Sequence, residues 1–191
     1  MNAGCRARWR GVGVSVILAA ACLLPNDRMA AAGATQARSE VSVTAAFLYN
    51  FAKFTEWPAL PPGASIAMCV VADAVMADAV AATVRGERIN GHPLGVSQPQ
   101  DSAAWERCQV LFISDAEIRR STEALGRIRA RPVLTVSDAR AFAESSGIIE
   151  LYVDSGKMRF AINVDAAERA GVRISSRLLG LAKIVRNTHA P

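Results

Sequence analysis

The segment Gln109-Val110-Leu111-Phe112-Ile113 is a short apolar run, and it leads directly into Ser114 and Asp115, two residues that commonly cap helices. A helical segment then extends to about Ala130, and a second apolar run, Val-Leu-Thr-Val, occupies residues 133–136. A strand, a helix and a strand in this order predict two parallel strands joined by a right-handed crossover. This unit therefore predicts an α/β fold with a mostly parallel sheet.

The same alternation of strands and helices extends towards the N-terminus. Residues 35–40 are polar, and we expect them to precede the first helix as a flexible segment. In chain order, the pattern then predicts a helix from residue 41 to the prolines at 58, 61 and 62, a strand at 65–71, a helix at 75–84, a strand at 93–97 and a short helix or turn at 101–107.

The C-terminal third predicts a hairpin, because the apolar runs 148–153 and 157–163 flank a turn with glycine at residues 154–156. Asp165 is expected to cap a short helix that ends near Gly171. A last helix is predicted from Ser175 or Ser176, with an apolar side made of Leu178, Leu179, Leu181, Ala182 and Val185. We thus predict one three-layer α/β domain over residues 35–191, with a mostly parallel sheet flanked by helices and a C-terminal antiparallel hairpin.

The N-terminus has the pattern of a secretory signal peptide over residues 1–34. Three arginines, at 6, 8 and 10, precede an uncharged apolar stretch at 11–24, and small residues follow at 30–34. An uncleaved membrane anchor is the alternative, although the apolar stretch is shorter than the ~20 residues that a spanning helix needs. Lipidation at Cys22 is a further alternative. The pattern predicts a protein that is exported to the periplasm.

The charge distribution gives no support for nucleic-acid binding. Four of the 22 basic residues and one of the 17 acidic residues lie in the predicted signal peptide, which leaves a net charge of only +2 on residues 35–191. No basic run is interleaved with aromatic residues. The basic character of the chain therefore belongs mostly to the segment that we expect to be removed.

Two of the four cysteines lie in the predicted signal peptide, and Cys69 and Cys108 remain. In an exported chain two cysteines predict one disulfide, and the alternative is a pair of independent buried thiols. We predict no metal site, because the only histidines are His92 and His189 and no close Cys/His spacing exists.

The sequence predicts no enzyme and no bound cofactor. No glycine-rich turn follows the strand that ends at Val71, and neither a P-loop nor a Gly-x-Ser-x-Gly motif is present. His92 stands in a turn, where a lone histidine is more often a solvated residue than a catalytic base. The carboxylates are scattered along the chain, so no two of them are predicted to face each other across a cleft for general acid–base catalysis.

Several segments together resemble a known family. The two most specific are residues 45–58, AAFLYNFAKFTEWP, and the pair FAIN at 160–163 with GVRISSRLLGLA at 171–182. Between them lie further similar segments at 86–93, 108–114 and 134–138. In this order, from about Val41 to Arg186, they resemble the YfiR-like family of periplasmic proteins.

The resemblance implies an α/β domain that forms homodimers. It also implies a regulator that restrains a membrane-bound diguanylate cyclase, or another sensor protein, by binding the periplasmic domain of that partner and thereby lowers cyclic di-GMP. Cys69 and Cys108 match positions where the family can carry a disulfide. A second cysteine pair of some members is absent here, which argues against strong redox control.

Four residues in the similar segments are predicted to contact a partner: Tyr49, Trp57, Arg173 and Arg177. Tyrosine, tryptophan and arginine are common anchors in protein interfaces. The alternatives are core packing for the rings and two solvated arginines at a helix start. Asn163 is most simply interpreted as a turn residue.

A second function is compatible with the same fold. A periplasmic small-molecule binding protein would hold its ligand at the carboxyl ends of the parallel strands. A hydrolase with dispersed catalytic residues is a third hypothesis. The absence of a recognisable set of nucleophile and base argues against it.

Overall fold

The computed structural model describes residues 27–145 and 147–187, with side chains described from Gln36 onward. Within this part of the chain, an eight-stranded sheet has the order β10-β8-β7-β6-β5-β2-β4-β3. The elements, in chain order, are α1 (Asp27–Lys53), β1 (Thr55–Glu56), β2 (Ile66–Val71), α2 (Ala74–Val84), β3 (Arg88–Ile89), β4 (His92–Ser97), the 3₁₀ helix η1 (Ser102–Arg107), β5 (Val110–Ile113), α3 (Asp115–Ile128), β6 (Leu134–Ser137), β7 (Ile149–Asp154), β8 (Lys157–Asn163), α4 (Val164–Ala170), β9 (Arg173–Ile174), α5 (Ser176–Leu179) and β10 (Lys183–Val185).

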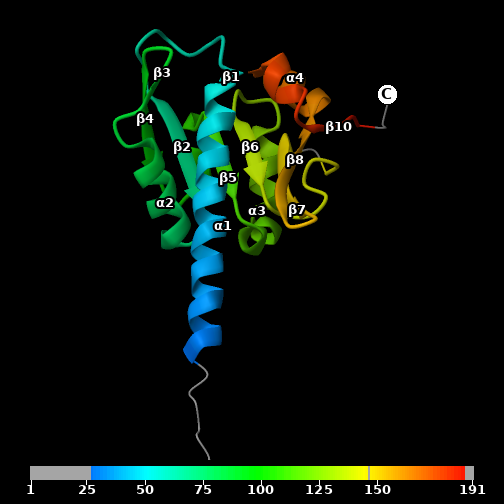
Figure 1. Cartoon of the computed structure of the whole chain (residues 1–191). Helices are drawn as coiled ribbons and strands as arrows, with labels where there is room; N and C mark the ends of the chain where they lie inside the picture. Colours follow the sequence, from blue (N-terminus) through cyan, green and yellow to red (C-terminus); the bar gives the residue numbers. More distant parts are fainter. Residues whose placement is uncertain (1–26, 146, 188–191) are drawn as a thin grey trace, which may run out of the picture.

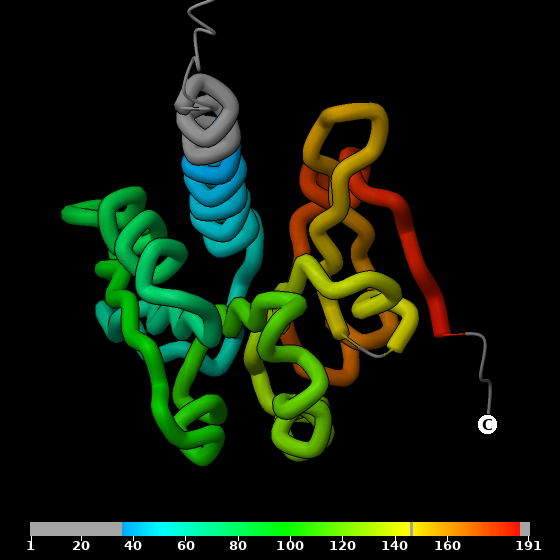
Figure 2. The backbone as a smooth tube through the Cα atoms, turned by 90° about the horizontal axis from the view of Figure 1, so that it is seen from below, coloured from blue at the N-terminus to red at the C-terminus, as the bar shows by residue number. Residues whose placement is uncertain are grey.

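The predicted fold class is confirmed. Strands β4, β2, β5, β6 and β7 run parallel to one another, β3 is antiparallel to β4, and β7 and β8 form the antiparallel hairpin. Helix α1 lies on one side of the sheet, here called the front, and α3 lies on the opposite side (Figures 1 and 2). Two buried apolar clusters fill the layers, a larger one under α1 and α2 and a smaller one under η1 and α3.

The strand–helix–strand unit that starts at Val110 forms as predicted, because β5 and β6 pair in parallel along four residues. All four residues of β5 are buried, since helices cover the sheet on both faces at this position. Ser114 is the N-cap residue of α3, but its side chain makes no capping hydrogen bond. Instead, the backbone N–H of Asp115 donates to the Asp138 carboxylate at 2.7 Å.

The predicted disulfide between Cys69 and Cys108 is present, and both residues are buried. Cys69 lies on β2, and Cys108 directly precedes the neighbouring strand β5. The bond therefore ties η1 to the back of the sheet. In the chain-entropy approximation, closing a loop of this length stabilises the fold by about 4 kcal/mol.

The prediction for the chain ends was wrong in two places. Helix α1 begins at Asp27, so residues 35–40 are helical and not a flexible segment; alanine, glutamine, arginine and glutamate are good helix formers. The last helix has only the single turn α5, and Lys183–Val185 forms the edge strand β10 parallel to β8. The main-chain pairing with β8 therefore replaces the helix that the leucine spacing predicts. Of the predicted signal peptide, residues 1–26 lie outside the described residues.

Asn163, interpreted as a turn residue, is fully buried and joins three segments. Its side-chain oxygen accepts the N–H of Ala166 at 2.9 Å, so Asn163 and not Asp165 caps α4. Its amide nitrogen donates to the backbone oxygen of Ala143 at 2.6 Å. The residue therefore fixes both α4 and the connection between β6 and β7.

We predict that Asn163→Ala lowers the free energy of unfolding by about 2–4 kcal/mol, because it removes a helix cap and leaves a buried carbonyl without a partner. Asp165→Ala is the matched control and should cost about 1 kcal/mol or less, since among the described residues its carboxylate binds Arg186 and Asn187, at the C-terminal end of the described chain. Urea unfolding of both variants measures the difference. Equal losses would contradict the assignment of the cap.

Candidate interaction surface

The two most specific segments of the sequence meet in space through a small separate sheet. Strand β1 pairs with β9 in antiparallel fashion, with Thr55 opposite Ile174 and Glu56 opposite Arg173. The backbone N–H of Ser175 also donates to the oxygen of Phe54 at 2.9 Å. The end of α1 is thereby joined to the segment that leads into α5.

Aromatic rings fix α1 on the front of the sheet. The ring centroids of Phe47 and Phe51 lie 5.9 and 5.1 Å from that of Phe160 on β8, in edge-to-face arrangements. Phe51 and Phe160 are buried, and Phe47 is partly buried. The helical spacing of these rings therefore serves core packing, and it sets the side of α1 that faces the hairpin.

Tyr49 lies on the other flank of α1, which faces α2. Its hydroxyl donates to the Glu87 carboxylate at 3.0 Å, in the turn between α2 and β3. This hydrogen bond to Glu87 is the largest cause that raises the pKa of Tyr49, and desolvation and the negative charge of Glu87 add to it. Tyr49 thus links α1 to the α2–β3 turn at a partly exposed position.

Trp57 is only 8 % exposed and packs into the front core, so it offers little surface to a partner. Its indole nitrogen and the hydroxyl of Thr55 are buried without a hydrogen-bond partner among the described residues. Arg173 and Arg177 are both exposed, on β9 and α5, and neither forms an ion pair within the described residues. The structure therefore brings Trp57 and the two arginines to the same end of α1 and places Tyr49 apart from them.

A surface that the sequence analysis missed lies beside α1. Residues paired across β7, β8 and β10 share one face of the sheet, so Val153, Met158 and Ile184 point to the same side as Phe160. Val153 is 62 % exposed, Ile184 44 %, and Val43 on α1 39 %. With the partly buried Phe47, these residues form what we call the front apolar face: Val43, Phe47, Val153, Met158 and Ile184.

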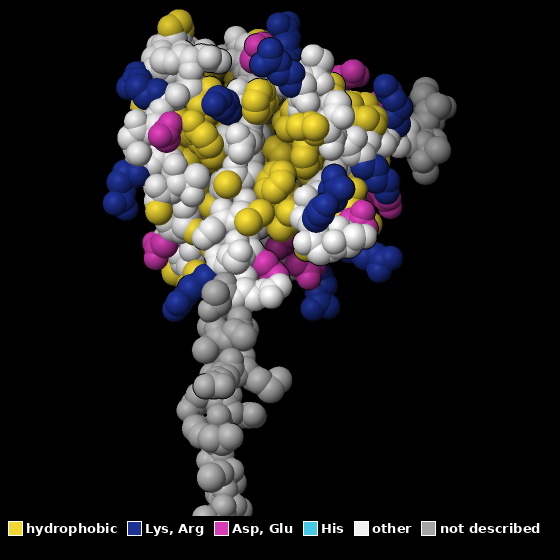
Figure 3. All heavy atoms as spheres, in the orientation of Figure 1, with side chains coloured by type: hydrophobic (Ala, Val, Ile, Leu, Met, Phe, Trp, Pro, Cys, Tyr) yellow, Lys and Arg dark blue, Asp and Glu magenta, His cyan; other side chains and the backbone are white. Residues whose placement is uncertain are grey.

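The front apolar face is visible in the space-filling view, where apolar side chains gather between α1 and the hairpin (Figure 3). A groove of about 650 Å³ lies at its lower end, between the N-terminal half of α1 and the tip of the hairpin, and is lined by Glu40, Val43, Val153 and Met158 among others. Exposed apolar patches of this kind commonly mark protein interaction sites. Among residues 27–145 and 147–187, α1 is the long helix that lies on this side of the sheet (Figure 1).

The structure gives His92 a structural contact. Its Nδ1 atom lies 2.8 Å from the backbone oxygen of Ala64, which ties the start of β4 to the loop before β2. Within residues 27–145 and 147–187, no cluster of three or more His, Cys, Asp or Glu side chains has the arrangement of a metal site. In the same residues, no helix is both long enough and apolar enough to cross a membrane.

The sequence profile of the YfiR/HmsC-like family matches residues 41–183, from the middle of α1 to the first residue of β10. The chain belongs to the YfiR/HmsC-like family. The predicted resemblance is thereby confirmed. This family is known for periplasmic regulation, and it is regulatory rather than catalytic.

Among solved structures, this YfiR/HmsC-like chain is similar to a conserved domain protein from Vibrio cholerae O1 biovar eltor. The sequence identity is 17 % and the TM-score 0.39, and the match covers 62 % of this chain and 54 % of that protein. The match thus spans about half the length of the Vibrio protein.

We predict that Glu87→Gln lowers the pKa of Tyr49 towards its ordinary value near 10, because the carboxylate stabilises the protonated hydroxyl. The contribution of this bond to stability is complete below about pH 10 and is lost as the pH rises through the raised pKa. The chain has two tyrosines, so a Tyr152→Phe background leaves Tyr49 as the only one. Ultraviolet titration of tyrosinate in that background gives the value, with Glu168→Gln as a distant control. Equal pKa values with and without Glu87 would contradict the assigned cause.

Proposed function

We propose that this protein restrains a membrane-bound diguanylate cyclase by binding the periplasmic portion of that enzyme, and thereby lowers cyclic di-GMP. Membership of the YfiR/HmsC-like family supports a periplasmic regulatory role. The observation that carries the proposal is the front apolar face, which exposes Val43 on α1, Val153 near the hairpin tip and Ile184 on the edge strand β10, all on one side of the sheet. Such a face is suited to a protein partner rather than to a water-soluble substrate.

Restraint requires that the regulator bind the inactive conformation of the cyclase more tightly than the active one. A difference of about 3 kcal/mol already changes the ratio of the two conformations more than a hundred-fold. Val43, Val153 and Ile184 are 39–62 % exposed, so burying the rest of each contributes roughly half of the about 1.5–3 kcal/mol that full burial gives, and the three together supply energy of this order. The front apolar face is therefore large enough to act as the centre of such a contact.

Polar contacts at the rim would determine orientation. Arg173 and Arg177 are exposed at the end of α1 and are proposed to bind carboxylates of the partner. Tyr49 is a proposed contact on the opposite flank of α1. Trp57 is nominated with them, but its burial means that it would act mainly by holding β1 in place.

The location and assembly complete the proposal. We propose that residues 1–34 are a cleaved signal peptide, that residues 35–191 are the mature domain, and that the mature protein is a periplasmic homodimer. Mass spectrometry of the exported protein should find a mature N-terminus between Ala30 and Ala34. Retention of Arg6 to Arg10 would contradict cleavage, and a mature chain starting at lipidated Cys22 would show an anchored form.

We predict that Val153→Glu abolishes the restraint of the cyclase, because a carboxylate buried in an apolar contact must be desolvated without a partner. Val75→Glu on α2 is the matched control, since Val75 is 58 % exposed but lies away from the front apolar face. In a strain that lacks the gene, cyclic di-GMP should be high. The wild-type protein and Val75→Glu should lower it, and Val153→Glu should not.

The same three proteins, carrying an affinity tag, should differ in the membrane protein that they co-purify. Val153→Glu should lose a cyclase that wild type and Val75→Glu retain, and thermal unfolding confirms that both variants are folded. Restoration of low cyclic di-GMP by Val153→Glu would overturn the assignment of the surface. Unchanged cyclic di-GMP on deletion of the gene would overturn the proposed function.

A further inference from the structure

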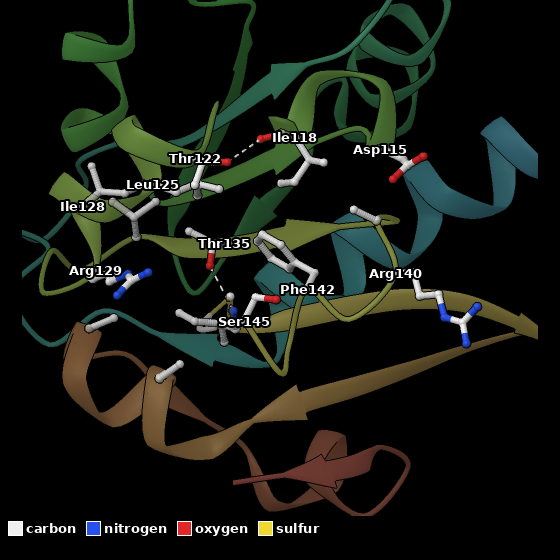
Figure 4. Close-up of a pocket in the computed structure, with 16 residues that line it drawn as sticks. Asp115, Ile118, Thr122, Leu125, Ile128, Arg129, Thr135, Arg140, Phe142 and Ser145 are labelled. Carbon is white, nitrogen blue, oxygen red and sulfur yellow. Dashed lines mark hydrogen bonds between the residues drawn. The ribbon is translucent and has the colours of Figure 1, made fainter. Parts of the chain in front are cut away.

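A cavity of about 350 Å³ lies on the back of the sheet, on the side opposite the front apolar face. Helix α3 forms one wall, Thr135 on β6 lies at its floor, and the β6–β7 connection with Phe142 and Ser145 forms the other wall (Figure 4). Ala166 and Ala170 of α4 close one end. The volume corresponds to about twelve water-sized groups, at roughly 30 Å³ each.

Hydrogen bonds hold the β6–β7 connection away from α3. The Glu150 carboxylate accepts the N–H groups of Ala141 and Ala143 at 3.2 and 3.1 Å, and Asn163 donates to the oxygen of Ala143. The Phe142 ring lies directly on Gly147, where an added Cβ would overlap the ring. The connection is therefore fixed on the sheet, and the space between it and α3 is preformed.

The cavity is mainly apolar, with two polar features that point to a ligand. Ile118, Leu125, Ile128 and Val133 contribute much of the apolar lining. At the floor, the buried Thr135 hydroxyl accepts the N–H of Ile148 at 3.0 Å, and its own proton has no acceptor among the described residues. A buried hydroxyl of this kind can donate to a polar atom inside the cavity.

The second feature is Arg129, which lies at the rim of the cavity (Figure 4). Its neighbours along the chain are paired, since Arg127 binds Glu123 and Arg131 binds Glu106. Arg129 forms no ion pair with a described residue. At the opposite rim, Arg140 points away from the cavity and Asp115 supplies a negative charge (Figure 4). An anion would therefore be favoured only at the Arg129 rim.

We propose that this cavity binds a monocarboxylate with a hydrocarbon body of about ten carbons, its carboxylate at Arg129 and its body between α3 and Phe142. A single arginine matches one carboxylate, whereas a nucleotide or a dianion would bring more charge than the site neutralises. The apolar walls match a hydrocarbon body, and a hydroxyl or keto oxygen on that body is the acceptor that Thr135 can bind; decanoate, which lacks such an oxygen, tests the carboxylate and the apolar walls alone. The site is separate from the front apolar face, so this proposal does not depend on the proposed cyclase partner.

Isothermal titration of the purified mature protein with decanoate and with decan-1-ol, both kept below the concentrations at which they aggregate, tests the proposal. Wild type should bind decanoate saturably, at one site per chain. Arg129→Gln should weaken decanoate binding about ten-fold or more, because it removes a charged hydrogen-bond donor, and should leave decan-1-ol unchanged. Arg131→Gln, paired to Glu106 outside the cavity, is the matched control and should leave both unchanged.

Thr122→Trp adds a test of position, because Thr122 lines the cavity from an exposed site on α3 and a larger side chain there fills it. It should abolish binding of both probes while the thermal unfolding temperature stays near that of wild type. Absence of saturable decanoate binding by wild type would overturn the proposal. An equal loss of decanoate affinity in Arg129→Gln and Arg131→Gln would also overturn it. If Thr122→Trp is unstable, the comparison of the two arginine variants decides the question by itself.

Discussion

The packing of α1 on the front of the sheet determines which residues of the front apolar face are exposed. The contacts of Phe47 and Phe51 with Phe160 place the helix across the middle of the sheet, and its end then leads directly into β1. Because β1 pairs with β9, the helix also sets the position of Arg173 and the start of α5. The rings cover Phe160 in the middle of the hairpin but leave Val153 near its tip and Ile184 on the edge strand exposed. The front apolar face is thus a consequence of where one helix stops covering the sheet.

Much of the fold could be predicted from the sequence, because its strands are locally defined. The fully buried β5 and β6 are apolar runs between capping residues, and the hairpin has a turn with glycine at its centre. The last segment was not predictable in this way. Leu178, Leu179 and Leu181 have helical spacing, but the pairing of Lys183–Val185 with β8 is a long-range main-chain contact that local spacing does not encode.

The candidate site was less predictable, since exposure depends on which neighbouring element covers a residue. Val153 is an apolar residue of a strand, a type that is usually buried, and it is exposed because no neighbouring element covers this end of the hairpin within the part of the chain that the structure describes. Trp57 shows the converse, because a ring typical of interfaces is here buried in the front core. The cap that Asn163 gives to α4 is a local signal that asparagine often carries, but its contact with Ala143 is not predictable in this way, because the two residues lie twenty positions apart in the chain.

The two proposed sites share one structural unit, although they lie on opposite sides of the sheet. Strand β7 carries Val153 on the front, and its Glu150 carboxylate holds the cavity wall at Ala141 and Ala143 on the back. Asn163, at the end of β8, binds the same wall. A ligand in the cavity changes the affinity of the front face for its partner only if it stabilises one arrangement of this unit over another. By linkage the partner must then change the affinity for the ligand by the same factor. Coupling between the sites can therefore be measured through the affinity of either one.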